Sequence, residues 1–289
     1  MYLTDDYITM LPSKNLADFT GFGTGGDALA IYAPKNLLQL SRLLKDFPKR
    51  YILGKGTNVI AYDEGYNGTV ILTKNLNAMS VKNNCITFEA GVMLSDLCKF
   101  ALENSLSGVE ELYGIPGTMG GAIFMNAGAY DTEIKDVLKT VTVFENNKES
   151  INYRGDRCGF SYRTSRFQDE PNSVILKGEI VLTPAEGEAI KKKMDAVIEK
   201  RKASQPLEYR SCGSTFKRPQ GAYASKLIDE CGLKGLTIGG AMVSTKHAGF
   251  IINYNNASSS DIFMLMAEVA RIVYLKTGYE LIPEVRVLE

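Results

Sequence analysis

The chain has 289 residues, of which 45% are hydrophobic and 23% are charged, the balance of a water-soluble globular protein. Its 33 basic and 33 acidic residues cancel, so no general attraction to nucleic acids or anionic membranes is expected. No segment approaches the run of about 18 apolar residues that a transmembrane helix needs. A chain of this length predicts two or three packed units.

The cysteines and the first residues indicate a compartment. The five cysteines are odd in number, widely spaced and without a C-x-x-C pair, so neither a disulfide framework nor a zinc site is expected. Free thiols are typical of a reducing compartment. The first ten residues contain neither the basic segment nor the apolar run of a secretory signal. We therefore expect a cytoplasmic protein.

Hydrophobic periodicity predicts alternating helices and strands in the first 185 residues. Helices are expected at 36–47 and 94–104, and strands at 27–32, 51–53, 59–62, 69–73 and 86–89. Residues 108–130 are rich in Gly and Ala and have no clean period. A hairpin is expected at 138–144 and 150–153, across the polar turn at 145–148, followed by a strand at 174–182.

The composition changes at Pro184, which suggests a boundary. A charged connecting helix is expected at 186–202, followed by helices at 222–230 and 261–276 and strands at 241–244, 250–253 and 284–288. This mixture, without internal repeats, predicts an α+β or mixed α/β fold.

Residues 21–26 (GFGTGG) fit the G-x-G-x-x-G dinucleotide fingerprint. That fingerprint requires a strand before it and a helix after it, because the pyrophosphate meets the helix N-terminus. Here a strand is expected to follow, so we interpret the segment as a glycine turn of another architecture.

Two other glycine loops are better candidates for a ligand site. One spans 53–59 (LGKGTNV) and the other spans 114–130 (GIPGTMGGAIFMNAGAY). Glycine lets the backbone approach a ligand, and consecutive N–H groups can hold a diphosphate without a cationic side chain. Side chains that could add hydrogen bonds are Thr57, Asn58, Thr118 and Asn126.

The same loops carry a family resemblance. The second is similar to the string GIPGxxGGAxxxNAGAYG of the UDP-N-acetylenolpyruvoylglucosamine reductase (MurB) family, and the first resembles that family's LGGGSN. Three further matches follow in the expected order: residues 160–165 resemble F-x-Y-R-x-S, residues 213–219 resemble GSxFKxP, and residues 283–285 resemble PEV. The resemblance spans nearly the whole chain, from about residue 19 to residue 287.

The resemblance implies a fold and a cofactor. The fold is an α+β, FAD-binding pair of subdomains of the vanillyl-alcohol-oxidase (PCMH) type, here 1–75 and 76–185, with a C-terminal α+β substrate domain at 186–289. FAD would be bound non-covalently, by Gly54, Lys55, Gly56, Thr57, Asn58, Gly117, Thr118, Gly120, Gly121, Ala122, Asn126, Ala127 and Gly128. Lys55 stands where the family often has glycine. The chain resembles the shorter subclass, which lacks an extra tyrosine loop.

The resemblance also implies a reaction. NADPH reduces FAD, and the flavin then reduces the enolpyruvyl group of UDP-N-acetylglucosamine enolpyruvate in peptidoglycan precursor synthesis. Ser214 matches the proton donor, with Lys217 as a possible aid; Arg163 matches a catalytic arginine; and Glu284 matches a catalytic glutamate that either pairs with Arg163 or polarises the α-carbon region. Expected substrate-binding residues are Tyr162, Arg210, Lys217 and Arg218, although many relatives have no basic residue at position 210.

Two rival readings remain. A flavin oxidase of the same fold would use oxygen, but many such oxidases attach FAD to a histidine in the N-terminal half, and the one histidine here is His247. We do not expect His247 to act in catalysis, and we expect Cys212 to be a buried thiol. A non-catalytic flavin or nucleotide binder would not need the set of Arg163, Ser214 and Glu284. No metal, no nucleic acid and no membrane are expected as partners, and the protein is expected to be a monomer.

Overall fold

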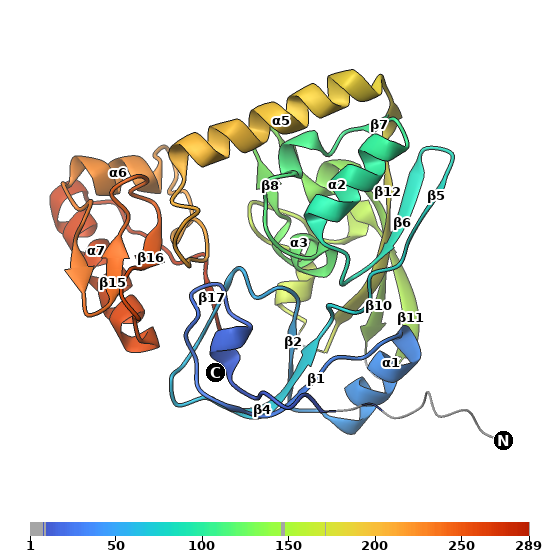
Figure 1. Ribbon diagram of the computed structural model, residues 1–289, viewed down its shortest axis with the longest axis horizontal. Coiled ribbons are helices and arrows are strands. Elements are labelled where there is room, and N and C mark those ends of the chain that lie inside the picture. The colour runs from blue at the N-terminus through green and yellow to red at the C-terminus, as the bar shows by residue number, and fades with distance from the viewer. Residues whose placement is uncertain (1–7, 9, 146–147, 171, 289) are drawn as a thin grey trace. The chain divides into compact units, whose positions relative to one another are not determined.

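The computed structural model describes residue 8 and residues 10–145, 148–170 and 172–288 (Figure 1). Most of the ten residues examined for a secretory signal lie outside this part. Residues 146–147 of the predicted hairpin turn lie outside it as well. Contacts divide the chain into two units. The first contains residues 1–12, 30–55 and 69–200, and the second contains 13–29, 56–68 and 201–289.

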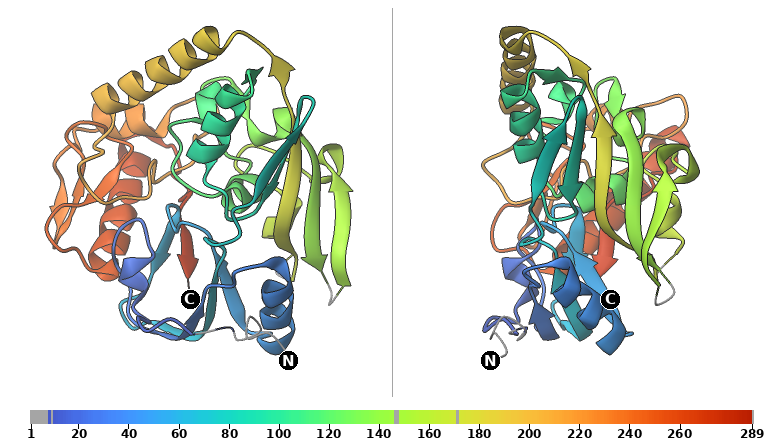
Figure 2. Two further views of the ribbon diagram at one scale, coloured as in Figure 1. Left: turned by 45° about the vertical axis from the view of Figure 1, so that its right-hand side comes forward. Right: turned by 90° about the vertical axis from the view of Figure 1, so that its right-hand side faces the viewer.

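The first unit is built on a five-stranded antiparallel sheet, whose strands run side by side in Figure 2. Its order is β11 (Lys148–Arg154), β10 (Leu138–Glu145), β12 (Val174–Val181), β6 (Cys85–Glu89) and β5 (Met79–Lys82). The helices α2 (Leu94–Glu103) and α3 (Met119–Met125) and the start of α5 (Gly187–Ser204) share its apolar core. Leu97, Ile123 and Ile180 are completely buried there, and burial of such side chains stabilises the unit.

A smaller sheet has the order β1 (Ala28–Tyr32), β4 (Tyr66–Leu72), β2 (Arg50–Leu53). Strands β2 and β4 are parallel, with Leu53 opposite Leu72. The helix α1 (Leu37–Asp46) begins at Asn36, whose side chain accepts the N–H of Gln39, and such a cap satisfies an otherwise unpaired donor. The leucines of α1 pack against β4, β10 and β12 within the first unit.

The second unit is assembled from segments far apart in the sequence. The helices α6 (Ala224–Glu230) and α7 (Ser259–Thr277) pack with the sheet β14 (Thr237–Ile238), β15 (Ala241–Val243), β16 (Ile251–Asn253). The last strand, β17 (Arg286–Leu288), runs parallel to β3 (Val59–Ala61). The remaining short elements are β7 (Leu106–Ser107), β8 (Gly128–Ala129), β9 (Thr132–Glu133), α4 (Ile134–Val137), β13 (Thr183–Pro184) and the 3-10 turns at Leu16–Asp18, Glu110–Leu112, Gly155–Arg157 and Arg166–Gln168.

All five predicted helices are confirmed, and so are most predicted strands. The last strand is a correction: it was expected from residue 284 but begins at Arg286, because Pro283 and Glu284 pair with residues 215–216 before the chain enters β17. The glycine turn at 21–26 is followed by strand β1, which confirms that it is not a dinucleotide fingerprint. Within the described part of the chain, no helix is long and apolar enough to cross a membrane.

The three expected domains came from the family resemblance and from the change of composition at Pro184, whereas the two units come from contacts. The first unit ends inside α5, at residue 200, and the second takes in two early segments of the chain. The three-domain division therefore stays a prediction.

Candidate active site

The two glycine loops meet inside the first unit. Gly54 follows β2, and Thr118 is the N-cap of α3, its hydroxyl accepting the N–H of Gly121 at 3.4 Å. A Cβ on Gly54 would overlap Oγ1 of Thr118. Thr118 is buried and has little room to yield, so only glycine at position 54 permits this approach of the two loops.

Four backbone N–H groups belong to the segments in which these loops meet. Those of Gly54, Lys55, Gly117 and Thr118 have no hydrogen-bond partner among the residues that the structure describes. Backbone N–H groups clustered in this way suit an anion such as a diphosphate. Buried backbone N–H groups in folded proteins are nearly always paired with protein, water or a ligand. Because the chain has no net charge, a bound anion must be held by local donors, and these N–H groups can serve as such donors.

The first turn of α3 does not supply such donors. The N–H groups of Met119 and Gly120 donate to Val92 and Ala90, each at 2.8 Å. Gly120 also packs against Ala90, so its lack of a side chain serves the fold. Ala122 is buried and Gly121 is exposed. Of these, Gly121 has the surface that a direct contact with FAD requires.

The other half of the first loop belongs to the second unit. Gly56 has a φ of +72°, and a Cβ there would overlap the carbonyl oxygen of Phe19. The side-chain amide of Asn58 donates to the backbone carbonyl of Glu284 at 3.1 Å. The backbone carbonyl of Asn58 accepts the N–H of Arg286 at 3.0 Å. Asn58 and its neighbour Thr57 are half-buried. Within this unit, Asn58 therefore holds the segment 284–286 against the first glycine loop by two hydrogen bonds.

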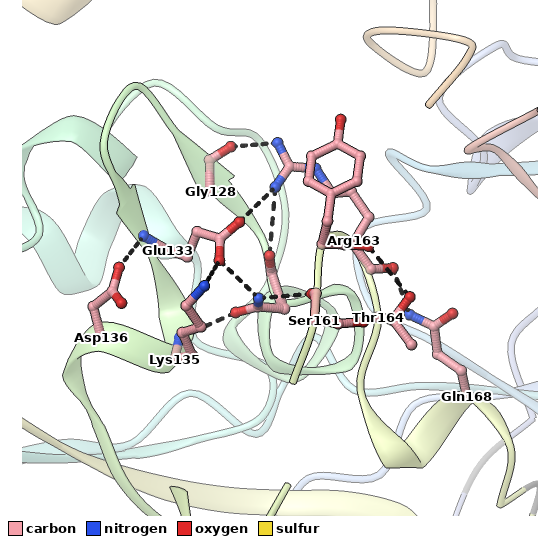
Figure 3. A network of polar contacts seen from close by, with 10 residues as sticks. Gly128, Glu133, Lys135, Asp136, Ser161, Arg163, Thr164 and Gln168 are labelled. Carbon is pink, nitrogen blue, oxygen red and sulfur yellow. Dashed lines mark hydrogen bonds and ion pairs between the residues drawn. The ribbon is translucent and has the colours of Figure 1, made fainter. Parts of the chain in front are cut away.

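Arg163 lies in the first unit on a tight turn closed by reciprocal backbone hydrogen bonds of 3.1 Å between Ser161 and Thr164. Its φ of +54° is left-handed, which costs free energy for a residue with a side chain. Its guanidinium donates to the carbonyl of Gly128 at 2.7 Å and faces the carboxylate of Glu133, with 3.8 Å from Nη1 to Oε1 (Figure 3). The carbonyl of Gly128 and the carboxylate of Glu133 therefore orient the guanidinium of Arg163.

Asn126 is the centre of the same network. It is completely buried, with a left-handed φ of 43° as the C-cap of α3. Its amide nitrogen donates to Glu133 Oε2 at 3.1 Å and to the carbonyl of Ser161 at 3.0 Å, and its oxygen accepts the N–H of Lys135 at 3.1 Å. Both amide protons are thus engaged by protein. Asn126 thus holds the loop of Arg163, and its contact with FAD stays a prediction.

Two neighbouring residues of the predicted FAD-binding set are also accounted for by the fold. Gly128 opens the two-residue strand β8 and pairs with Glu133 of β9. The N–H of Ala127 donates to the carbonyl of Ala122 at 2.8 Å. These contacts place both residues beside Arg163 and Asn126.

Ser214 and Glu284 lie on adjacent segments of the second unit. Thr215 donates its N–H to the carbonyl of Gly249 and accepts, at 2.9 Å, the N–H of Glu284. Ser214 is exposed and Glu284 is half-buried. A hydroxyl and a carboxylate are thus carried by paired backbone segments, while Arg163 belongs to the first unit.

The expected substrate-binding side chains have different surroundings. Tyr162 is 43% exposed, and the guanidinium of Arg163 lies 5.1 Å from its ring centre. In the second unit, Arg218 stacks on Tyr223 at 4.4 Å, and Lys217 is half-buried. Arg210 packs against Gly23 and donates to the carbonyl of Ala17 at 3.3 Å, so its guanidinium already supports the glycine turn.

The remaining titratable candidates are His247 and Cys212. Burial lowers the pKa of His247, which is half-buried and whose Nδ1 accepts the N–H of Gly249. Burial raises the pKa of Cys212 to about 12. The expectation that Cys212 is a buried thiol is confirmed.

Two residues of this region, Glu133 and Thr215, were not predicted from the sequence. Glu133 is one of several polar residues after the glycine string, and Thr215 lies between two residues of the GSxFKxP match. Nothing in a single sequence distinguishes either residue from its neighbours, because their importance comes from contacts made by the folded chain.

The fold and the glycine loops define a flavin-binding protein with an additional C-terminal domain. Residues 28–152 match the FAD binding domain family, and residues 205–288 match the C-terminal domain of UDP-N-acetylenolpyruvoylglucosamine reductase. The reductase of that name from Caldicellulosiruptor bescii is 42% identical over 99% of this chain and 93% of its own length. That from Carboxydothermus hydrogenoformans is 42% identical over 96% of this chain and 94% of its own.

A solved structure agrees. The crystal structure of UDP-N-acetylenolpyruvylglucosamine reductase from Thermus caldophilus has a TM-score of 0.86 and 33% identity, covering 98% of this chain and all of that one. The chain therefore belongs to the UDP-N-acetylenolpyruvoylglucosamine reductase family. The family resemblance, the fold class and the FAD-binding oxidoreductase class predicted from the sequence are confirmed.

Proposed function

We propose that this protein reduces UDP-N-acetylglucosamine enolpyruvate to UDP-N-acetylmuramate, with non-covalently bound FAD and with NADPH as the reductant. The observation that carries the proposal is the 42% identity, over nearly the full length, to reductases named for this substrate. The reaction is a step of peptidoglycan precursor synthesis, and we propose that the protein carries it out in the cytoplasm as a monomer.

The residues present fit FAD. The unpartnered N–H groups of Gly54, Lys55, Gly117 and Thr118 suit its diphosphate. Gly56, Thr57 and Asn58 continue the same loop, and Gly121 offers exposed backbone. Of the other predicted contacts, Gly120, Ala122, Ala127 and Gly128 support the loop from within, and Asn126 acts through Arg163. When bound, FAD supplies a hydride, gained from NADPH, to the enolpyruvyl β-carbon.

Arg163 would bind the carboxylate of the enolpyruvyl group. A guanidinium stays charged at all relevant pH values and forms paired hydrogen bonds with a carboxylate. Negative charge that develops at the α-carbon spreads into that carboxylate, so a fixed cation there stabilises the transition state more than the ground state. The contacts of Arg163 with Gly128 and Glu133 support such a fixed position.

Ser214 would deliver the proton to the α-carbon, which completes the lactyl ether. A serine hydroxyl is a weak acid, so it requires exact placement and a favourable electrostatic setting. Glu284 and Lys217 are the charged groups nearest to it along the paired segments 214–217 and 282–284. Glu284 would orient the α-carbon region, and Lys217 would stabilise the hydroxyl as it loses its proton.

The UDP part of the substrate would meet the basic residues near Ser214. Lys217 and Arg218 supply two positive charges for the diphosphate, and Tyr162 supplies an exposed ring on the first unit. Arg210 is the weakest member of this set because its guanidinium is engaged with the carbonyl of Ala17.

A stopped-flow experiment tests the function. The FAD-loaded protein is reduced anaerobically with NADPH and then mixed with UDP-N-acetylglucosamine enolpyruvate, while the flavin absorbance is followed. Rapid, substrate-dependent recovery of the oxidised spectrum is expected. Recovery only on admission of oxygen would reject the reductase in favour of the oxidase, and failure to bind FAD would reject both.

A further inference from the structure

We propose that Glu133 is a positioning residue for Arg163, holding the guanidinium in the orientation that receives the substrate carboxylate. The inference rests on the function proposed above and adds a residue to the site that the sequence did not indicate. It follows from the contacts of one carboxylate and from the hairpin that carries it (Figure 3).

The two oxygens of Glu133 have different partners. Oε1 faces Nη1 of Arg163 at 3.8 Å. Oε2 accepts a hydrogen bond from the amide of Asn126 at 3.1 Å and pairs with the ammonium of Lys135. A carboxylate held on one oxygen by a buried amide has little freedom to turn, so its other oxygen presents a fixed negative charge to Arg163.

The backbone of Glu133 is fixed as well. Its N–H donates to Asp136 Oδ2 at 2.8 Å in the capping box of α4. On the other side, Glu133 of β9 pairs with Gly128 of β8. The carbonyl of Gly128 accepts the 2.7 Å hydrogen bond from Arg163. One short hairpin therefore supplies two of the groups that hold the guanidinium, a carbonyl from one strand and a carboxylate from the other. The carbonyl of Asn126 is a third partner, at 3.5 Å from Nη1.

The exposure of the pair makes the charge effective. The side chain of Arg163 is 20% exposed and that of Glu133 is 21% exposed. Solvent screens a pair of this kind less than it screens a pair on the open surface. The geometry is not that of a paired hydrogen bond, so Glu133 acts on the guanidinium through its charge.

The variant Glu133→Gln isolates that charge. Glutamine keeps the size of the side chain and an oxygen for the amide of Asn126, but it removes the negative charge facing Arg163. The matched control is Glu170→Gln, which removes the carboxylate partner of Arg166, a 2.7 Å ion pair in the same unit. Glu170 is 32% exposed, and its arginine has no proposed role in the reaction.

We expect Glu133→Gln to slow reoxidation of the flavin by UDP-N-acetylglucosamine enolpyruvate on the order of 10- to 100-fold, because misplacing a reacting partner by a small distance costs rates of that size. The rate of flavin reduction by NADPH, the FAD content and the midpoint of thermal unfolding should match those of the wild type. Glu170→Gln should leave both half-reactions unchanged. Equal slowing of both half-reactions in Glu133→Gln, or no slowing of either, would overturn the proposal.

Crystal structures of the wild type and of Glu133→Gln test the same inference without catalysis. In the variant, the guanidinium of Arg163 should leave the carbonyl of Gly128. An unmoved guanidinium would refute the positioning role even if the wild type proved to be an active reductase. A moved guanidinium in a protein that does not reduce the substrate would support the positioning role and reject the proposed function.

Discussion

The peptide N–H of Glu284 donates a 2.9 Å hydrogen bond to the carbonyl of Thr215, the residue that follows Ser214. Antiparallel bridges join Phe216 to Pro283 and Ser214 to Phe250, so residues 214–216 form a central strip between two other segments. The spacing of Ser214 and Glu284 is therefore set by backbone hydrogen bonds. Replacing either side chain should leave that spacing intact.

Substitution of Ser214 by alanine should separate proton delivery from hydride chemistry. Ser214 is exposed, so the variant should fold and bind FAD as the wild type does. Reduction by NADPH should be unchanged, while substrate-dependent reoxidation slows by about 10² to 10⁴, the usual contribution of a positioned acid. Stopped-flow absorbance measures both rates. A variant that reoxidises at the wild-type rate would exclude Ser214 as the proton donor.

Thr215 should be important for stability. It is completely buried, and its hydroxyl oxygen accepts the N–H of Ile251 at 3.1 Å. Thr215→Val keeps the shape but leaves that N–H buried and unpaired, which should lower the free energy of unfolding by about 1–3 kcal/mol. Thr215→Ser, which keeps the hydroxyl, is the control and should lose less. Urea denaturation compares the two; equal losses would show that the methyl group matters instead.

Gly54→Ala should weaken FAD binding. The new Cβ would overlap Oγ1 of the buried Thr118, so the two loops must separate. Overpacking of this kind costs about 1–3 kcal/mol. A loss of that size in FAD binding, about 5- to 150-fold in Kd, would be visible in a flavin fluorescence titration.

The double variant Gly54→Ala/Thr118→Ala tests the cause, because it removes the oxygen that the new methyl group meets. It should regain part of the loss relative to the sum of the single variants. Strict additivity would mean that the approach of the two loops is not what Gly54 provides.

His247 should make the protein less stable in mild acid. Burial lowers its pKa in the folded state, so below about pH 6.5 the unfolded chain binds the proton more readily than the folded chain. Stability is therefore fully present above the unfolded pKa and falls as the pH drops toward the folded pKa.

Urea unfolding of the wild type and of His247→Gln between about pH 5 and 7.5 measures this contribution. The acid loss should be smaller in the variant. Because the chain has one histidine, a single imidazole proton resonance reports the folded pKa directly. A resonance that titrates at or above the value for an unfolded peptide would contradict the prediction.

Only Cys85 among the five cysteines should react quickly with a thiol reagent in the folded protein. Cys85 is half-buried and the other four are buried. Burial also raises the pKa of Cys158 to about 11 and that of Cys212 to about 12, so little thiolate exists at neutral pH. Titration with a chromogenic disulfide should give one equivalent in buffer and five in urea. A second rapid equivalent in buffer would indicate an opening of the fold.

The helices α1, α2, α5, α6 and α7 were predictable because each carries an apolar face at helical spacing. The helix α3 was not, since Gly120 and Gly121 weaken the local preference for helix. It forms because Met119 and Ile123 are buried in the core and Thr118 caps its start. Tertiary packing decided what local sequence left open.

The candidate site was predictable to a different extent. Arg163, Ser214 and Glu284 were found because each stands inside a recognisable motif, and their roles stay predictions. Glu133 and Thr215 were not found, because their partners meet them only in the folded chain. Glu133 contacts Arg163, and Thr215 accepts a hydrogen bond from Ile251. The contacts of Asn126 with Glu133 and Ser161 were not predictable either, because a sequence does not show which groups an amide meets in the folded chain.

The discontinuous second unit has a consequence for synthesis on the ribosome. Residues 13–29 and 56–68 emerge early, but the strand that pairs with β3 is β17, which includes Arg286–Leu288 and is synthesised much later. The long-range pairing cannot form before residues 286–288 have been synthesised. The first unit has all its segments by residue 200 and can begin to fold earlier. Nascent chains released before residue 286 should therefore be efficient targets for chaperones and proteases.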